Sequence, residues 1–306
     1  MAEIQYSETI AQNVRGRVVV LTGGAQGIGA ATVTLLHSLR AHVVFGDVAD
    51  SASKELEASL SVSQQPNPNS GTVHFVKTDV CSYPDQLALF DDAFRRYGRV
   101  DAGITCAGVI GDLDIFDPSK LTIEAVREES PSLNKTLNIN LISAMHFARI
   151  ATAYITASPR LPGPFTPSLT FTSSVAGIAW ATSMPCYSAS KHGLLGLSRA
   201  LSFSPSPTGI RSNTICPSAT NTALVSSALR RMWTGALGLS FQEPSDVARY
   251  IVQCVADSAL NGKALLVARG EARDIEKGLE ECAEGWMGEE NAREWRLLKD
   301  VVKSKV

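Results

Sequence analysis

Short apolar runs rich in β-branched residues recur along the chain and alternate with longer stretches of mixed polarity. Such runs are typical of strands buried on both faces, and the stretches between them are typical of helices. Seven runs predict strands, near residues 17–22, 42–47, 72–77, 100–105, 168–173, 210–215 and 263–268. The alternation indicates βαβ units, whose right-handed crossovers place helices on both faces of the sheet. We therefore predict a single α/β domain with a doubly wound, parallel, seven-stranded sheet.

Three polar segments interrupt this alternation. Residues 61–71 are rich in proline, asparagine and serine, residues 158–168 hold four prolines, and residues 203–209 hold two more. Proline lacks a backbone donor and fixes φ, so it excludes regular structure from these stretches. We interpret all three as surface connections within one domain.

The first predicted strand runs directly into a glycine-rich turn. Gly23, Gly27 and Gly29 follow the strand, and a helical stretch begins at once. Glycine permits a tight turn and a close backbone approach, and the helix N-terminus offers free N–H groups and a partial positive charge. Asp47 ends the second strand, close to the offset from Gly29 that is expected of an acid that binds ribose hydroxyls. This arrangement predicts a dinucleotide site.

A second pattern lies in the run from Met184 to Gly193, where Lys191 follows Tyr187 by four positions. Four residues make about one helical turn, so both side chains lie on one face. A nearby ammonium favours the phenolate, so the pair predicts a tyrosine that transfers protons. The alternative interpretation is a packed core tyrosine beside a solvated lysine.

Together, the Thr-Gly-Gly-x-x-Gly-Ile-Gly motif near the N-terminus and the later Tyr-x-x-x-Lys motif resemble the short-chain dehydrogenase/reductase family over roughly residues 15–270. This resemblance implies a Rossmann-type sheet and a tyrosine-dependent catalytic set. Ser174 precedes Tyr187 at the family's usual spacing, at a strand end, and Asn140 lies in an Asn-x-Asn-Leu run. The implied catalytic residues are Asn140, Ser174, Tyr187 and Lys191.

The resemblance also assigns the cofactor site. Asp79 and Val80 match a pair that contacts adenine, and Pro217 leads towards a threonine that contacts the nicotinamide amide. The carboxylate of Asp47 repels a 2′-phosphate and Gln26 brings no compensating charge, so NAD is predicted rather than NADP. The implied cofactor-binding residues are Gly23, Gln26, Gly27, Ile28, Gly29, Asp47, Asp79, Val80, Ala107, Gly108, Tyr187, Lys191, Pro217, Thr220 and Thr222.

The chain departs from the family pattern in two places. Thr105-Cys106-Ala107-Gly108 stands where the family usually has Asn-Asn-Ala-Gly, so both amides that steady this loop are absent. Ser218 follows Pro217 where the family usually has glycine, which adds a side chain beside the nicotinamide end.

We divide the chain into a dinucleotide-binding and catalytic domain, 1–270, and a tail extension, 271–306. Within the domain, about residues 218–243 are expected to form a substrate lid. Within it, residues 219–241 are mostly aliphatic, with Arg230 and Arg231 as their charged residues, which suits a hydrophobic substrate; the alternative is a stripe packed on the body. The tail docks on a neighbouring subunit, flanks the pocket, or forms a surface helix.

Composition narrows the function. The net charge of −2 and 19% charged residues describe a globular protein without a basic surface for nucleic acid. Neither a secretory signal nor an apolar run long enough to span a membrane is evident. The six cysteines are scattered and the five histidines lack ligand spacing, so we predict no metal, and a reduced, cytoplasmic setting.

The predicted activity is hydride transfer between NAD and a hydrophobic secondary alcohol or ketone, with Tyr187 as general acid or base. The resemblance extends to fungal secondary-metabolism members and prostaglandin-dehydrogenase-like members, which implies a terpenoid, steroid-like or polyketide substrate and a homodimer or homotetramer. Two alternatives stay open: an isomerase or cyclase on the same fold, and a non-catalytic protein that senses NAD.

Overall fold

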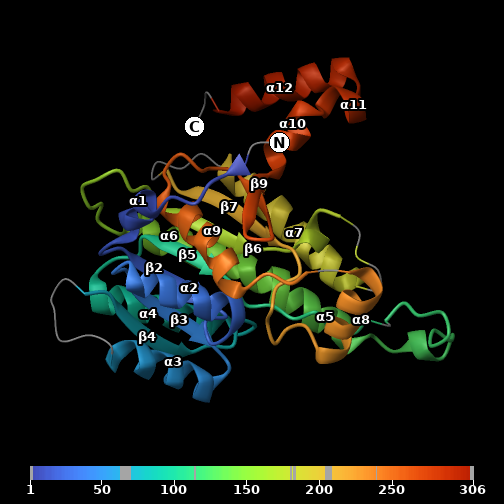
Figure 1. The fold of residues 1–306 in the computed structure, drawn as a ribbon, viewed down its shortest axis with the longest axis horizontal. Helices are drawn as coiled ribbons and strands as arrows, with labels where there is room; N and C mark the ends of the chain where they lie inside the picture. Colours follow the sequence, from blue (N-terminus) through green and yellow to red (C-terminus); the bar gives the residue numbers. More distant parts are fainter. Residues whose placement is uncertain are drawn as a thin grey trace.

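The computed structural model describes residues 3–62, 70–113, 115–179, 181, 184–203, 209–238 and 240–303. A central sheet lies between two layers of helices (Figure 1). The predicted connection at 158–168 is irregular up to residue 167, whereas those at 61–71 and 203–209 lie largely outside the described residues. Within the described residues, no helix combines the length and apolar composition needed to cross a membrane.

Seven parallel strands occupy the positions that the hydrophobic runs predict, which confirms the doubly wound parallel sheet. Across the sheet they lie in the order β8 (Ala264–Ala268), β7 (Arg211–Pro217), β6 (Ser168–Thr172), β5 (Ala102–Thr105), β2 (Val18–Thr22), β3 (His42–Asp47) and β4 (Thr72–Lys77).

Two short strands that the sequence analysis did not anticipate extend the sheet to nine. β9 (Glu271–Asp274) pairs antiparallel with β8, and β1 (Glu3–Ile4) pairs antiparallel with β9. Residues 271–274, which we had assigned to the tail, therefore belong to the sheet. The run Glu-Ala-Arg-Asp is too short and too polar to stand out as a buried strand.

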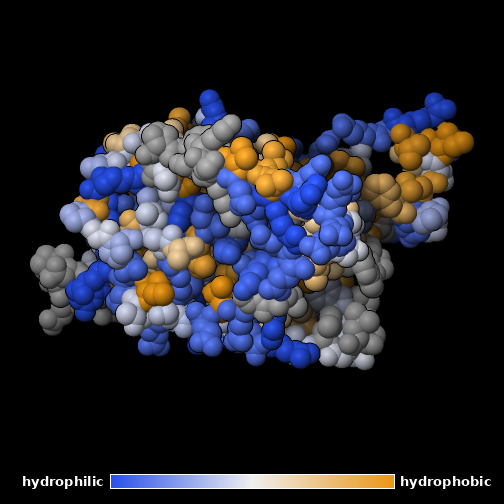
Figure 2. Space-filling view, turned by 90° about the horizontal axis from the view of Figure 1, so that it is seen from above, coloured by the Kyte–Doolittle hydropathy of each residue, from blue (hydrophilic) through white to orange (hydrophobic). Residues whose placement is uncertain are grey.

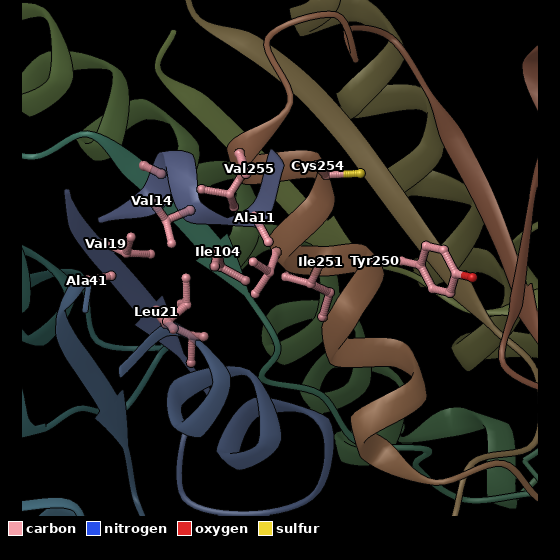
Figure 3. Close-up of a cluster of buried hydrophobic side chains, with 14 of the residues drawn as sticks. Ala11, Val14, Val19, Leu21, Ala41, Ile104, Tyr250, Ile251, Cys254 and Val255 are labelled. Atoms are coloured by element: carbon pink, nitrogen blue, oxygen red, sulfur yellow. The ribbon is translucent and has the colours of Figure 1, made fainter. Parts of the chain in front are cut away.

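Alternation along each strand divides the core into two layers. Val19 and Leu21 of β2 face one layer, while Val18 and Val20 face the other, because successive side chains point to opposite sides. Figure 3 shows the first layer, where β2 packs against the short helix α1 near the N-terminus and the longer helix α9 near the C-terminus.

Each layer of the core is covered by its own set of helices. The first layer holds α1 (Glu8–Ala11), the 3-10 turn η1 (Gln12–Val14), α2 (Gly27–Ser38), α3 (Asp50–Val62) and α9 (Pro244–Ala256). The second holds α4 (Tyr83–Tyr97), α6 (Ser143–Ala157) and α7 (Pro185–Ser202).

The strand order changes direction between β5 and β2, so the loops that follow these strands diverge at the carboxyl edge. In open α/β sheets a ligand crevice lies at such a point. The shorter elements that follow β5, β6 and β7 belong to this edge: η2 (Ala125–Arg127), α5 (Pro131–Leu137), a π-helical turn η3 (Asn138–Ile142), η4 (Val175–Gly177) and α8 (Ser227–Leu237).

The chain ends in three helices that stand apart from both layers (Figure 1). They are α10 (Ile275–Glu281), α11 (Ala283–Met287) and α12 (Glu289–Lys303), and we call residues 275–303 the C-terminal arm.

One buried arginine fastens the last helix of the body to the sheet. Nη1 of Arg211, at the start of β7, donates to the carbonyl oxygens of Cys254 (2.8 Å) and Leu260 (2.6 Å). Its Nη2 donates to Val255 (2.8 Å) and to Thr166 (3.1 Å). The guanidinium thus satisfies carbonyls at the end of α9 that the helix cannot satisfy itself.

We predict that Arg211→Met lowers the free energy of unfolding by about 3 kcal/mol, because it leaves several buried carbonyls without donors. Urea unfolding measures the change. Arg273→Met is the matched control, since Arg273 is exposed and pairs with Glu271 at 3.3 Å. The control should cost less than about 0.5 kcal/mol. Equal losses in the two variants would contradict the capping role.

Candidate active site

Tyr187 and Lys191 lie one turn apart near the N-terminus of α7, and both are buried, with 8% and 5% of their surfaces exposed. The Nζ of Lys191 lies 5.5 Å from the centroid of the Tyr187 ring. It donates a hydrogen bond of 2.9 Å to the carbonyl oxygen of Thr172, the last residue of β6. The predicted juxtaposition of phenol and ammonium is therefore present, and the sheet anchors the ammonium.

Ser174 lies two residues after the end of β6, and its side chain is near enough to Tyr187 to lower the pKa of the phenol. Its Oγ also accepts from the backbone N–H of Ala176 at 3.1 Å, which caps the 3-10 turn η4. Ser174 therefore has two roles in the structure. It caps the turn η4, and it also lies beside Tyr187 in the site.

Asn140 is buried in the π-helical turn between α5 and α6. Its Oδ1 accepts from the N–H of Val109 and its Nδ2 donates to the carbonyl of Val109, both at 2.8 Å. The Nδ2 also donates to Oγ of Ser190 at 3.0 Å. π-turns are rare and frequently occur at functional sites. This one directs the amide of Asn140 at the loop after β5.

The loop after β5 reaches the lysine at Gly108. A Cβ at this position would lie 3.3 Å from Oδ1 of Asn140 and 3.4 Å from Nζ of Lys191. Since such contacts are tight, glycine here permits the backbone to pass close to both side chains. The small residues Ala107 and Gly108 therefore let this end of the loop lie close to Asn140 and Lys191.

Burial dominates the ionisation of both catalytic candidates. It lowers the pKa of Lys191 to about 8. It also raises the pKa of Tyr187, while the hydrogen bond from Ser174 works in the opposite direction. Our expectation that Lys191 depresses the pKa of Tyr187 is therefore wrong for this structure. The ammonium lies over the ring face and is directed at Thr172 rather than at the hydroxyl.

Two buried thiols flank Lys191. The Sγ of Cys106 lies 3.4 Å from Oγ1 of Thr172, and burial raises the pKa of this thiol to about 11. Burial likewise raises the pKa of Cys216, at the end of β7, to about 12. Both groups are therefore neutral packing residues at pH 7. Cys106–Thr172 joins the ends of β5 and β6 where the usual asparagines are absent.

The glycine turn after β2 packs backbone against backbone. Gly23 has φ +77°, and a Cβ on it would lie 2.3 Å from the amide nitrogen of Ala107. A Cβ on Gly29 would lie 1.8 Å from the carbonyl oxygen of Gly23. Side chains at these positions would push the turn away from the start of α2 and from the loop after β5.

Asp47 closes this turn from the next strand. Its Oδ2 accepts from the N–H of Ala25 and its Oδ1 accepts from the N–H of Ala49, both at 2.9 Å. The carboxylate therefore orders the glycine turn and the start of α3, and each oxygen keeps acceptor capacity for another donor.

A cleft of about 600 Å³ opens between the glycine turn and the segment after β7. Its walls include Gly27, Thr222 and Arg230, and a Cβ on Gly27 would lie 3.0 Å from Cγ2 of Thr222. Glycine residues that keep a cleft open beside a helix N-terminus fit a dinucleotide pyrophosphate. Pro217 ends β7, and the buried Thr220 donates to the carbonyl of Ser218 at 2.8 Å instead of facing the cleft.

Four other predicted residues have their contacts elsewhere than in the catalytic set. Asp79 is exposed and its Oδ1 accepts from the N–H of Cys81 at 2.9 Å. The carbonyl of Val80 accepts from the side chain of Gln86. Gln26 is exposed at the start of α2, and Ile28 packs against the core.

The sequence analysis missed the residues that hold the catalytic set in place. Thr172 anchors Lys191, Ser190 accepts from Asn140, and Oγ of Ser173 donates to the carbonyl of Lys191 at 2.7 Å. Spacing signals Ser190, which follows Tyr187 by three positions on the same helical face. The role of Thr172 depends on its carbonyl group, which no side-chain motif marks.

Comparison with known proteins shows which family the chain belongs to. A sequence model of the family described as short chain dehydrogenase matches residues 17–232. The chain belongs to this family. A short-chain dehydrogenase/reductase of Acremonium egyptiacum, ascJ, is 32% identical and covers 91% of this chain and 87% of its own. The family consists of oxidoreductases that act on alcohols and ketones with a nicotinamide cofactor.

Two other relatives illustrate the range of the family. A (+)-borneol dehydrogenase of Salvia officinalis is 31% identical, over 69% of this chain and 72% of its own. Tropinone reductase-like 1 of Erythroxylum coca is 29% identical, over 96% and 97%. A dehydrogenase/reductase of Sinorhizobium meliloti 1021, 18% identical, superposes with a TM-score of 0.70 over 86% of this chain and 99% of its own, which supports the fold.

Metal ligands do not form a cluster in the described part of the chain: no group of three or more histidine, cysteine, aspartate or glutamate side chains is placed to hold an ion.

We predict that Lys191→Met raises the free energy of unfolding at pH 7 by about 2 kcal/mol, because it removes a buried cation. The folded pKa, about 8, lies below the ordinary 10.5, so the unfolded chain binds this proton more tightly. Wild-type stability should then rise as the pH increases from about 8 towards 10.5, and the gain from the substitution should shrink.

Thermal unfolding at pH 7 and pH 10 measures this difference. The exposed Lys54, paired with Asp50 at 2.7 Å, supplies the control Lys54→Met, which should change stability little at either pH. A Lys191→Met protein less stable than wild type at pH 7 would show that the bond to Thr172 outweighs the cost of burial.

Proposed function

We propose that this protein is an NAD-dependent dehydrogenase that transfers a hydride between the nicotinamide and a hydrophobic secondary alcohol or ketone, with Tyr187 as the general acid or base. The observation that carries the proposal is the buried Tyr187 with Ser174 and Lys191 beside it, at the same edge of the sheet as the glycine turn after β2. Asn140, Ser174, Tyr187 and Lys191 are the proposed catalytic residues.

When bound, NAD supplies the hydride acceptor. The protein's own residues manage the proton and the orientation. Tyr187 accepts the proton of the substrate hydroxyl during oxidation and returns it during reduction, and the hydroxyl of the neighbouring Ser174 would hydrogen-bond the substrate oxygen. Because burial raises the pKa of Tyr187, the phenol is protonated at neutral pH. The phenolate fraction increases as the pH rises, so the rate of oxidation should increase with pH.

The glycine turn, Asp47 and the segment after β7 are proposed to hold the dinucleotide. The remaining acceptor capacity of Asp47 suits the hydroxyl pair of an adenosine ribose, whereas its charge repels a 2′-phosphate. Lys54 brings no compensation, because it pairs with Asp50. These contacts favour NAD over NADP.

The proposed lid, about residues 218–243, supports a hydrophobic substrate. Those residues of α8 whose side chains the structure describes are half-exposed or exposed, which supports a lid over the site more than a stripe packed on the body. Its base is tied down by Arg230, which donates to Oδ1 of Asn221 and lies 5.0 Å from the Phe241 ring centroid.

Apolar side chains also stand out on the segment between β5 and α5. The exposed residues there are Phe116, Leu121, Ile123 and Val126. Figure 1 draws this segment and α8 towards the same end of the molecule, and Figure 2 shows hydrophobic side chains gathered at the projecting end. Two apolar segments beside one site suit a terpenoid, steroid-like or polyketide compound, as in secondary metabolism.

The domain assignment, the assembly and the location remain part of the proposal. We propose that residues 1–270 with β9 form the catalytic unit, that the protein is a homodimer or homotetramer, and that it works in the reducing cytoplasm. The last point rests on six free cysteines, two of them exposed.

We predict that Tyr187→Phe lowers kcat about a thousandfold, because no other group at the site replaces the phenol as proton carrier. NADH absorbance with (+)-borneol and a panel of larger secondary alcohols measures turnover, and titration of intrinsic fluorescence measures NAD binding. Tyr154→Phe is the control, since Tyr154 bonds to Asp91 on another part of the surface.

NAD affinity should change less than about twofold in both variants, since neither loses the glycine turn. A Tyr187→Phe enzyme with near wild-type turnover would overturn the assignment. A wild-type protein that binds NAD but turns over no alcohol or ketone would favour the NAD-sensing alternative, and product formation without NADH would favour the isomerase or cyclase.

We predict that Asp47→Asn raises the KM for NAD about tenfold to a hundredfold and narrows the preference over NADP, because it removes the charge that repels a 2′-phosphate. The ratio of kcat/KM for the two cofactors measures the effect. Glu55→Gln removes an exposed carboxylate of α3 and should leave the ratio unchanged. A preference for NADP in the wild type would contradict this reading of Asp47.

A further inference from the structure

The proposed lid, about residues 218–243, is closed at its base by backbone hydrogen bonds. The N–H of Asn221 donates to the carbonyl oxygen of Gln242 at 2.8 Å, and the N–H of Gln242 donates to the carbonyl oxygen of Ala219 at 3.0 Å. Thr220 and Gln242 form an isolated parallel bridge. The chain therefore leaves the body and returns to it at one place, and Gln242 is the residue at which it returns.

The side chain of Gln242 joins this base to β8. It has 5% of its surface exposed, and its Nε2 donates to the carbonyl oxygen of Val267 at 2.9 Å. The same nitrogen lies 3.3 Å from the hydroxyl oxygens of Ser218 and Thr220. A primary amide has two N–H donors, so one serves the carbonyl and the two hydroxyls share the other. One buried amide therefore connects β8 with the chain that follows β7.

The oxygen of the same amide holds the turn between β8 and β9. The Oε1 of Gln242 accepts from the N–H of Gly270 at 3.3 Å. Arg269 and Gly270 have φ values of +54° and +76°, as the two central residues of a tight hairpin turn require. β9 then takes the chain back to the amino edge, so the C-terminal arm starts at the edge opposite Tyr187. The turn itself stays at the carboxyl edge, in contact with the base of the lid.

The residues that Gln242 holds include those that the proposed function places at the nicotinamide end of the cofactor. Ser218 stands where the family usually has glycine, and its hydroxyl gives the amide a further acceptor. Thr220 bonds to the amide directly, and its carbonyl oxygen accepts from the N–H of Thr222 at 2.9 Å. The position of Thr222 therefore depends on Thr220, and the position of Thr220 depends on Gln242.

The residues proposed to hold the adenosine half have other supports. Asp47 accepts from two backbone N–H groups at the glycine turn and the start of α3. The turn packs at Gly23 against the backbone of Ala107, in the loop after β5. Because none of these bonds involves Gln242, loss of its amide should disturb the nicotinamide end of the site and leave the adenosine end in place.

We propose that Gln242 is a positioning residue for the nicotinamide end of the cofactor site. The Gln242 clasp consists of the hydrogen bonds of its side chain with Ser218, Thr220, Val267 and Gly270. The clasp fastens residues 218–222 and the base of the lid to the β8–β9 turn, so this segment is in place before the cofactor binds. The role towards nicotinamide rests on the proposed function, whereas the clasp itself can be tested without a cofactor.

The first test is limited digestion with trypsin in the absence of cofactor. Arg230 and Arg231 are the charged residues of segment 219–241, so cleavage after them reports opening of the lid. Gln242→Met keeps the length of the side chain and removes the amide. Cleavage after the two arginines, measured by mass spectrometry, should become about tenfold faster, because the base of the lid opens more often.

Gln253→Met is the matched control, because Gln253 of α9 has 2% of its surface exposed and bonds to Ser7 and Asp257 instead. It should leave the rate of cleavage after the two arginines unchanged. Far-ultraviolet circular dichroism verifies that each variant is folded. Ser218→Ala removes one acceptor, should accelerate cleavage about twofold, and decides the test if Gln242→Met does not fold. An unchanged rate in the clasp variants, or equal acceleration in the control, overturns the clasp.

The second test compares the binding of NAD with that of ADP-ribose, which lacks the nicotinamide, by titration calorimetry. Gln242→Met should bind NAD about tenfold more weakly and ADP-ribose within about twofold of the wild type. A merely structural role would weaken both ligands alike, so equal losses, or an unchanged affinity for NAD, overturn the positioning role. A wild type that binds neither ligand overturns the proposed function and the role towards nicotinamide with it, and the digestion still decides the clasp.

Discussion

The buried ammonium of Lys191 is the charge around which the carboxyl edge of the sheet is arranged. A cation with 5% of its surface exposed is costly, and its lowered pKa reflects that cost. The ammonium donates a hydrogen bond to the carbonyl oxygen of Thr172, and the absence of a side chain at Gly108 lets the loop after β5 pass close to the ammonium. The neighbouring thiols of Cys106 and Cys216 stay neutral, so they do not turn the site into a closed ion pair.

The same constraint explains why backbone atoms dominate the site. The side-chain amide of Asn140 bonds to the backbone of Val109. The hydroxyl of Ser173 donates to the carbonyl of Lys191, and the carboxylate of Asp47 accepts from two backbone N–H groups. These bonds connect the loops after β2 and β5, the residue after β6 and the helices that begin at this edge of the sheet. The loop that lost the family's two asparagines is therefore still held, by Asn140 from one side and by the Cys106–Thr172 contact from another.

Much of the fold follows from local chemistry. Apolar runs predict the seven parallel strands, because a strand that is buried on both faces has apolar side chains at successive positions. Proline marks the loop at 158–168, and glycine marks the turn after β2. The short strands β1 and β9 could not be predicted this way, because their polar sequences become strands through pairing with an edge that already exists.

By itself the sequence determined the chemistry available: a tyrosine and a lysine one turn apart, a serine at the preceding strand end, a glycine turn and an acid at another strand end. These are short-range relations, which helix and strand periodicity convert directly into shared faces. The tertiary structure alone decided the environment. It showed that burial raises the pKa of Tyr187, that the ammonium is directed at Thr172, and that the arm leaves from the opposite edge. Those facts depend on contacts between residues far apart in the chain, which no local pattern encodes.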